Sequence, residues 1–216
     1  MIHCNNTDSP SLERPRPPGH VQRVGIFGGT FDPIHLGHLI LAEAAFESLS
    51  LDRVIFIPNG FSPFKVATPP LASPEDRLEM ISLSIKEEAR FSVDDREVRR
   101  SGPSYTIDTV RSLLAEYPGV RFVYLIGADN LKDLEKWHEI KELKNLVDFA
   151  VLDRRHLASS ESIEFPIVQR RIDLSSTEIR QQVKNGLSIR FMVSEGVYQY
   201  IMKRGLYHSP ITNAKA

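Results

Sequence analysis

The sequence has little cysteine, little tryptophan and no long apolar run. Its 216 residues include one cysteine, Cys4, and one tryptophan, Trp137. A single cysteine excludes an intrachain disulfide and fits a reducing compartment. No stretch approaches the roughly 18 uninterrupted apolar residues of a membrane span, and the first residues lack the apolar core of a signal peptide. We therefore expect a cytoplasmic protein that does not bind membranes.

The chain also lacks an excess of charge of either sign. Lysine and arginine total 27 against 28 acidic residues, which leaves a net charge of -1. Such a chain has no global field to hold DNA, so we expect no nucleic-acid partner and only local recognition of phosphate. With 41% apolar residues it is long enough to bury one good core, which favours one α/β domain.

Periodic apolar residues are absent from both ends of the chain. Residues 1–22 are polar and interrupted by prolines, which predicts a flexible extension. Residues 209–216 are interpreted as a C-terminal tail, and residues 23–208 as a single domain. The sequence leaves open whether the protein forms a homo-oligomer.

Within this domain the apolar pattern alternates between the strand period and the helix period. This alternation predicts a Rossmann-like, doubly wound, mainly parallel sheet with flanking helices. Strands are predicted from Val24 to the glycines that follow it, and over 53–57, 121–126 and 148–152. Helices are predicted around 39–49, after a Ser73 cap, around 107–114, and over 176–184 and 195–203.

The turn after the first predicted strand contains the strongest local signal. Gly28 and Gly29 let the backbone approach a ligand, and the helix that follows aims free amides and a partial positive charge at it. Glycines alone are equally compatible with a tight turn. His35 and His38 flank Gly37 at the helix entry, which strengthens the case for an anion site. Protonated imidazoles there would offset charge on transferring phosphates.

Two other functions compete for this segment. Asp32, His35 and His38 could be three ligands of a metal, but no further Cys/His cluster completes a tetrahedral set, so we predict no metal site. A dinucleotide-dependent oxidoreductase is disfavoured because the glycines do not follow the G-x-G-x-x-G spacing.

A second constellation lies near the C-terminus, at Ser176, Thr177 and Arg180. Hydroxyls and free amides at a helix start, followed one turn later by a planar guanidinium, form a second candidate phosphate cradle. Taken alone, the Ser-Ser-Thr-Glu run is also an ordinary helix cap.

Together the two motifs resemble the H-x-G-H and S-S-T-x-x-R signatures of the nucleotidylyltransferases. The chain is most similar to the bacterial nicotinate mononucleotide adenylyltransferases, from about Val24 to Tyr207. The resemblance implies transfer of the adenylyl group of ATP to nicotinate mononucleotide, which gives nicotinate adenine dinucleotide and pyrophosphate in NAD biosynthesis. It also implies a Mg²⁺ ion held mainly by the ATP phosphates. Further segments follow in that family's order, at residues 104–109, 126–130, 137–138 and 188–191.

The resemblance implies a role for each candidate residue. His38 is the first choice for stabilising the transition state, assisted by His35, Lys65 and Arg180. The acceptor would bind at Lys65, Tyr105, Thr106 and Trp137. Pyrophosphate would be held by Ser176, Thr177 and Arg180. The residues expected near ATP are Gly28, Gly29, Thr30, Phe31, His35, His38, Gly127, Asp129, Ser176, Thr177 and Arg180.

The chain departs from the family pattern at two positions. Phe64 stands where the family often has histidine, and Ser194, a good cap residue, replaces a proline before the last helix. Two alternatives stay open: an adenylyltransferase for nicotinamide mononucleotide or 4′-phosphopantetheine, and a catalytically silent nucleotide sensor.

Overall fold

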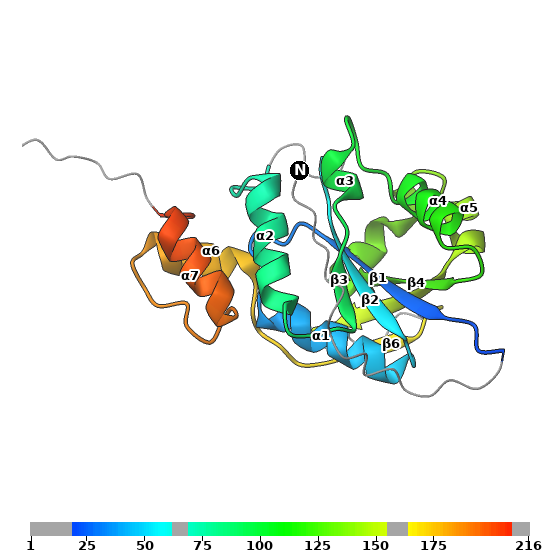
Figure 1. Cartoon of the computed structure of the whole chain (residues 1–216), viewed down its shortest axis with the longest axis horizontal. Helices are drawn as coiled ribbons and strands as arrows, with labels where there is room; N and C mark the ends of the chain where they lie inside the picture. Colours follow the sequence, from blue (N-terminus) through cyan, green and yellow to red (C-terminus); the bar gives the residue numbers. More distant parts are fainter. Residues whose placement is uncertain (1–18, 62–68, 155–163, 209–216) are drawn as a thin grey trace, which may run out of the picture.

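The computed structural model describes residues 19–61, 69–154 and 164–208 (Figure 1). Residues 1–18 of the predicted extension, Phe64, Lys65 and the predicted tail lie outside these ranges. Within them, every helix is too short or too polar to cross a bilayer. The elements are β1 (Arg23–Gly29), α1 (Leu36–Ser48), β2 (Arg53–Pro58), α2 (Pro74–Ile85), β3 (Phe91–Val93), α3 (Arg96–Arg99), α4 (Thr106–Glu116), β4 (Arg121–Gly127), η1 (Ala128–Lys136, a 3-10 helix), α5 (Ile140–Leu146), β5 (Asp148–Asp153), β6 (Ile167–Gln169), α6 (Ser176–Lys184) and α7 (Glu195–Arg204).

The strands form one six-stranded sheet in the order β3-β2-β1-β4-β5-β6, and every neighbouring pair is parallel. The predicted doubly wound, single-domain α/β fold is therefore confirmed. The strand order reverses between β1 and β4. In open parallel sheets, ligands bind outside the carboxyl ends of the strands at such a switch point. The ends of β1 and β4 are therefore where a site is expected.

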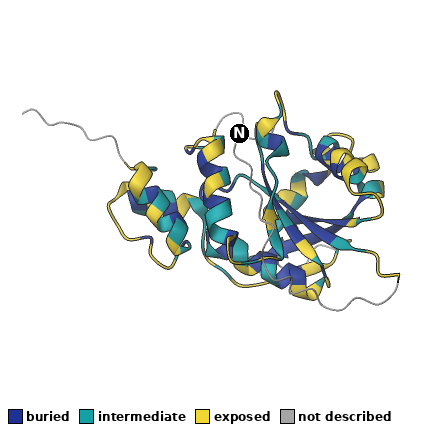
Figure 2. Cartoon of the chain, in the orientation of Figure 1, coloured by how far each residue is buried: buried dark blue, intermediate teal, exposed yellow. Residues whose placement is uncertain are grey.

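Each face of the sheet has its own apolar core. On β4, Phe122, Tyr124 and Ile126 join the core formed with α4, η1 and α5. Val123 and Leu125 point the other way, into the core shared with α1, α2, α6 and α7. The central strands are consequently buried on both faces, and the buried surfaces of the helices face them (Figure 2).

The longer predicted elements are confirmed, and the short ones were missed. The predicted cap of α2 forms, because the Asp76 amide donates to Ser73 Oγ at 3.0 Å. The apolar pattern gives no signal for β3, α3, α5 or β6, which are only three to seven residues long.

The prediction for Ser194 was wrong in part. Its backbone has the extended conformation of a cap, but its side chain makes no capping hydrogen bond. Its Oγ instead lies 3.3 Å from Ser84 Oγ on α2. The hydroxyl therefore links two packed helices rather than closing the start of α7.

Candidate active site

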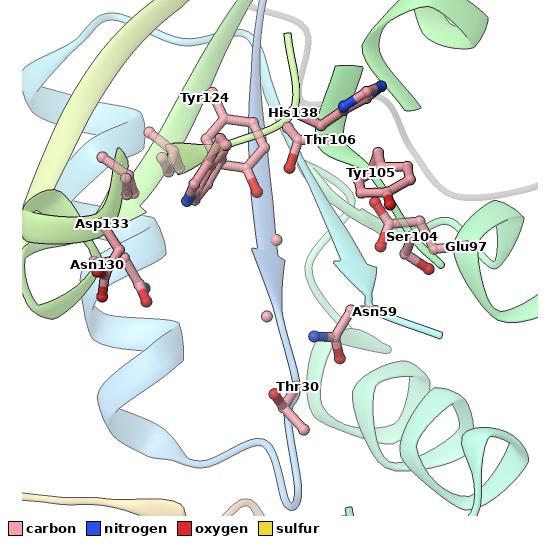
Figure 3. Close-up of a pocket in the computed structure, with 16 residues that line it drawn as sticks. Thr30, Asn59, Glu97, Ser104, Tyr105, Thr106, Tyr124, Asn130, Asp133 and His138 are labelled. Carbon is pink, nitrogen blue, oxygen red and sulfur yellow. The ribbon is translucent and has the colours of Figure 1, made fainter. Parts of the chain in front are cut away.

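A cleft opens at the carboxyl ends of β1, β2 and β4, where the switch point predicts a site (Figure 3). Polar side chains from several elements face it, including Thr30, Asn59, Thr106 and Asn130. The full lining is Gly28, Gly29, Thr30, Asn59, Glu97, Ser104, Tyr105, Thr106, Tyr124, Leu125, Ile126, Gly127, Asn130, Asp133, Trp137 and His138.

The two glycines of the first turn are required by close contacts. A Cβ at Gly28 would lie 2.5 Å from Tyr124 Oη, and one at Gly29 would lie 2.9 Å from the Phe31 ring. Phe31 has a positive φ of 50° and is buried beneath the turn. The two glycines are therefore needed for packing against Tyr124 and Phe31, and both also line the cleft.

The two histidines are stacked at the start of α1. His35 is the residue before the helix, and its ring lies 3.7 Å from the His38 ring, measured between centroids. The His35 amide donates to His38 Nδ1 at 3.2 Å. Because Nδ1 is an acceptor, a neutral His38 carries its proton on Nε2. The local fold therefore fixes one tautomer, with Nε2–H available to donate.

Both imidazoles are neutral in the free site. Burial lowers the pKa of His35 to about 3, and Arg154 adds to that effect. Burial also holds the pKa of His38 well below its ordinary value, with further contributions from His35 and Arg154. Protonation of the imidazoles, which was expected beside bound phosphates, is therefore disfavoured in the ligand-free chain, because desolvation and a nearby guanidinium disfavour the charged form.

The second motif docks directly on the first turn. Arg180 Nη1 donates to the carbonyl oxygen of Asp32 at 2.6 Å, and its Nη2 donates to Thr177 Oγ1 at 3.1 Å. Ser176 Oγ donates to the carbonyl oxygen of Pro33 at 2.9 Å. The fold thus brings together two motifs that are far apart in the sequence, and the Ser176 hydroxyl contributes to that junction.

Asp32 has a structural role in this junction. Its carboxylate accepts hydrogen bonds from the amides of Leu71 and Ala72, at 2.8 and 3.0 Å, and from Tyr207 Oη at 2.8 Å. Those contacts occupy the oxygens that a metal would need. Across the part of the chain that the structure describes, no group of three His, Cys, Asp or Glu side chains is placed to hold a metal ion.

The predicted acceptor residues gather on the opposite side of the cleft. Tyr105 precedes α4, Thr106 begins it, and the Tyr105 ring lies 4.5 Å from the His138 ring. Trp137 stands edge-on to Tyr124, with centroids 5.5 Å apart and planes at 87°. Tyr105, Thr106 and Trp137 therefore line one pocket.

The remaining candidate residues that the structure describes are divided between this pocket and the base of the first turn. Gly127 lines it, whereas Asp129 is exposed in the first turn of η1. His38 lies beneath the first turn, with its ring 5.0 Å from the Phe31 ring. His35, His38, Ser176, Thr177 and Arg180 are thus grouped at the base of the first turn rather than along the pocket lining.

Residues in and around the site that the sequence did not single out include Asn59, Glu97, Tyr124 and Arg154. Asn59 and Arg154 each directly follow a strand of the sheet, and that position could have identified them. Asn59 Oδ1 is buried and has no hydrogen-bond partner among the described residues. A ligand donor would satisfy it.

The fold and the cleft define a class of nucleotide-handling α/β proteins, and comparison with known proteins agrees. The model of the cytidylyltransferase-like family matches residues 26–182, from β1 into α6. A Plasmodium falciparum nicotinic acid mononucleotide adenylyltransferase, solved with NaAD, has the same fold. It superposes with a TM-score of 0.73 at 20% identity, covering 86% of this chain and 97% of that one.

Sequence relatives define the particular family. A Synechococcus protein named "Probable nicotinate-nucleotide adenylyltransferase" is 42% identical over 203 residues, covering 88% of this chain and 96% of the relative. A Geobacillus thermodenitrificans protein of the same name is 42% identical over 188 residues, covering 86% of each chain. The chain belongs to the nicotinate-nucleotide adenylyltransferase family.

Proposed function

We propose that the cleft transfers the adenylyl group of ATP to nicotinate mononucleotide, forming nicotinate adenine dinucleotide and releasing pyrophosphate. An oxygen of the acceptor's 5′-phosphate attacks the α-phosphorus of ATP, and the bond from that phosphorus to the bridging oxygen of pyrophosphate breaks. The observation that carries the proposal is the docking of Arg180 on the turn that contains His35 and His38, next to a separate aromatic pocket.

The phosphates of ATP would lie over the first turn. His38 Nε2–H donates to them, and the guanidiniums of Arg180 and Arg154 offset their charge. The attacking phosphate is already an anion, so catalysis requires in-line positioning and neutralisation rather than a strong base. Bound polyphosphate would raise the pKa of the imidazoles, so we expect ATP to bind with uptake of protons.

The acceptor would bind in the aromatic pocket. The Trp137 ring packs against the pyridine, and Tyr105 and Thr106 receive its carboxylate through backbone and hydroxyl donors. The unpaired Oδ1 of Asn59 offers an acceptor to a nucleotide hydroxyl. Lys65, outside the described residues, is assigned to the phosphates by family resemblance alone.

Magnesium is expected with ATP, but the described residues do not form a cage for it. The phosphates of the substrate would supply most of its ligands, since Mg²⁺ commonly binds through one or two carboxylates and substrate phosphates. When bound it would neutralise phosphate charge. We assign it no protein ligand and derive no step through it. The cytoplasm remains the expected compartment for this chemistry.

The test is an acceptor panel. Purified protein is given ATP with nicotinate mononucleotide, nicotinamide mononucleotide or 4′-phosphopantetheine, and pyrophosphate release is measured. Clear preference for the nicotinate form is expected. Preference for another acceptor would overturn the assigned acceptor. Calorimetric ATP binding without turnover of any acceptor would indicate a nucleotide sensor instead.

A further inference from the structure

Tyr124 lies where the two halves of the cleft meet. It is the fourth residue of β4, next to β1 at the point where the strand order reverses. Its side chain is buried and points into the cleft, with its hydroxyl near the chain of the first turn (Figure 3). A buried phenol at the switch point can therefore contact the residues assigned to ATP and also those assigned to the acceptor.

The hydroxyl of Tyr124 has one neighbour on each side. On the side of the first turn, it would lie 2.5 Å from a Cβ built on Gly28, so it rests directly against that glycine. On the other side lies Thr106, which also lines the cleft and acts on the phenol as a hydrogen-bond partner that lowers its pKa. Burial, with a smaller contribution from Glu97, raises the pKa of Tyr124, so the phenol stays neutral.

The ring of Tyr124 supports the aromatic wall. It meets Trp137 edge-on at 5.5 Å and Phe149 at 5.7 Å, measured between centroids. Edge-to-face pairs have a preferred orientation, so the ring of Tyr124 sets the plane that Trp137 presents. One side chain therefore contacts the glycine turn, the threonine and the tryptophan.

We propose that Tyr124 is a positioning residue. It holds Thr106 and Trp137 at a fixed position relative to Gly28 and thereby fixes where the acceptor lies relative to ATP. This inference rests on the proposed function, because it assigns Thr106 and Trp137 to the acceptor. A shift in either residue changes how the acceptor phosphate approaches the α-phosphorus, and misplacement of reacting groups is costly.

The test removes only the hydroxyl. Tyr124→Phe keeps both ring contacts and is expected to raise the KM for nicotinate mononucleotide about tenfold, the effect of one hydrogen bond. The KM for ATP should stay within about twofold. Quenching of Trp137 fluorescence by the acceptor gives its affinity without turnover, because the chain has one tryptophan. That affinity should fall by the same factor.

A double-mutant cycle shows whether Tyr124 acts through Thr106. If it does, Tyr124→Phe has no further effect in a Thr106→Val background. Tyr117→Phe is the matched control, because this exposed tyrosine ends α4 and bonds Glu116 instead. Additive effects, or equal changes in both KM values, would overturn the inference.

The wild-type panel separates the two failures. If the wild type turns over nicotinate mononucleotide and Tyr124→Phe has the same KM values as the wild type, only the positioning role is refuted. Absence of wild-type turnover refutes the proposed function, and the positioning role with it. Should Tyr124→Phe fail to fold by thermal melting, Thr106→Val alone must reproduce the selective loss of acceptor affinity, or the inference is wrong.

Discussion

The two sides of the cleft are built differently. The phosphate side, formed by Gly28, Gly29, His35, His38 and Arg180, comes from two short motifs whose groups bond to each other. The acceptor side comes from α3 and from the segments around α4, β4 and η1, and aromatic contacts join those last three segments. Each side keeps at least one buried polar atom without a partner among the described residues, His35 Nδ1 on the phosphate side and Asn59 Oδ1 on the acceptor side. The two sides therefore differ in how they are held together, by hydrogen bonds on the phosphate side and by ring contacts on the acceptor side.

Because of this difference, we expect substitutions on the two sides to affect different kinetic constants. A change on the phosphate side should act on the chemical step, since charge develops there. A change on the acceptor side should act on acceptor binding.

The largest effect is expected on the phosphate side, at His38. His38→Ala removes the Nε2–H donor and should reduce turnover by about a hundredfold or more, by analogy with loss of an oxyanion-hole donor. Steady-state kinetics with a thermal melt would check that the variant still folds. The control is His20→Ala, because His20 bonds Asp52 at the opposite end of the sheet. Near-normal turnover in His38→Ala would remove His38 from the mechanism.

Gly28 joins the two sides, and its substitution should disturb both. A Cβ at this position would lie 2.5 Å from Tyr124 Oη, so Gly28→Ala must displace the tyrosine or the turn. We expect kcat/KM for ATP, measured at saturating nicotinate mononucleotide, to fall about tenfold, a cost of about 1.4 kcal/mol. Adding Tyr124→Phe should recover part of the loss, because it removes the clashing oxygen.

The matched control for that clash is Gly196→Ala in α7. A Cβ there would lie 3.3 Å from Leu83 Cβ, and alanine suits a helix interior better than glycine. Its kinetics should equal those of the wild type. A double variant no better than Gly28→Ala would show that the hydroxyl is not the obstacle.

The phosphate side was predictable because its residues are close in sequence. Gly28, Gly29, His35 and His38 fall within one strand-turn-helix unit, and spacing alone placed them together. The sequence predicted that Arg180 belongs to a phosphate-binding motif, but only the fold shows that its guanidinium donates to the carbonyl oxygen of Asp32. The pairing of distant motifs depends on tertiary contacts.

The acceptor side was predictable only through family resemblance. Tyr124 sits inside an apolar strand, and the pattern says nothing about which strand lies beside it. Glu97 lies on the four-residue helix α3, too short for a periodic signal. The charge state of His35 also escaped prediction, since burial and Arg154 exist only in the folded chain.

A smaller effect is expected on stability as pH falls. The pKa of His35 is about 3 in the folded chain, below the 6.5 of an unperturbed histidine. Its contribution to stability is therefore full above pH 6.5 and is lost as the unfolded chain takes up a proton. Between those values His35 alone should remove about 1.4 kcal/mol of unfolding free energy for each pH unit.

Denaturant unfolding of wild type and His35→Gln across pH 5 to 7 would measure this effect. The variant should have the flatter profile, and the same change at exposed His208 serves as the control. Bound ATP should weaken the pH dependence by raising the imidazole pKa. Parallel profiles would show that His35 is not held neutral by the fold.

The smallest effect is expected on the acceptor side, at Glu97. Burial raises the pKa of Glu97 despite the hydrogen bond from Thr109 Oγ1 at 2.8 Å and the opposing charge of Arg100, while Asp94 adds to the rise. A raised carboxyl pKa favours folding at low pH, and that advantage is lost as pH rises from the unfolded pKa to the folded one. Glu97→Gln keeps an acceptor for Thr109 and removes the charge. The melting temperature of Glu97→Gln, relative to that of the wild type, should therefore be higher at pH 8 than at pH 5. A gain that does not vary with pH would mean that ionisation of Glu97 does not limit stability, and that the acceptor side tolerates a buried carboxylate because Thr109 and Arg100 compensate it.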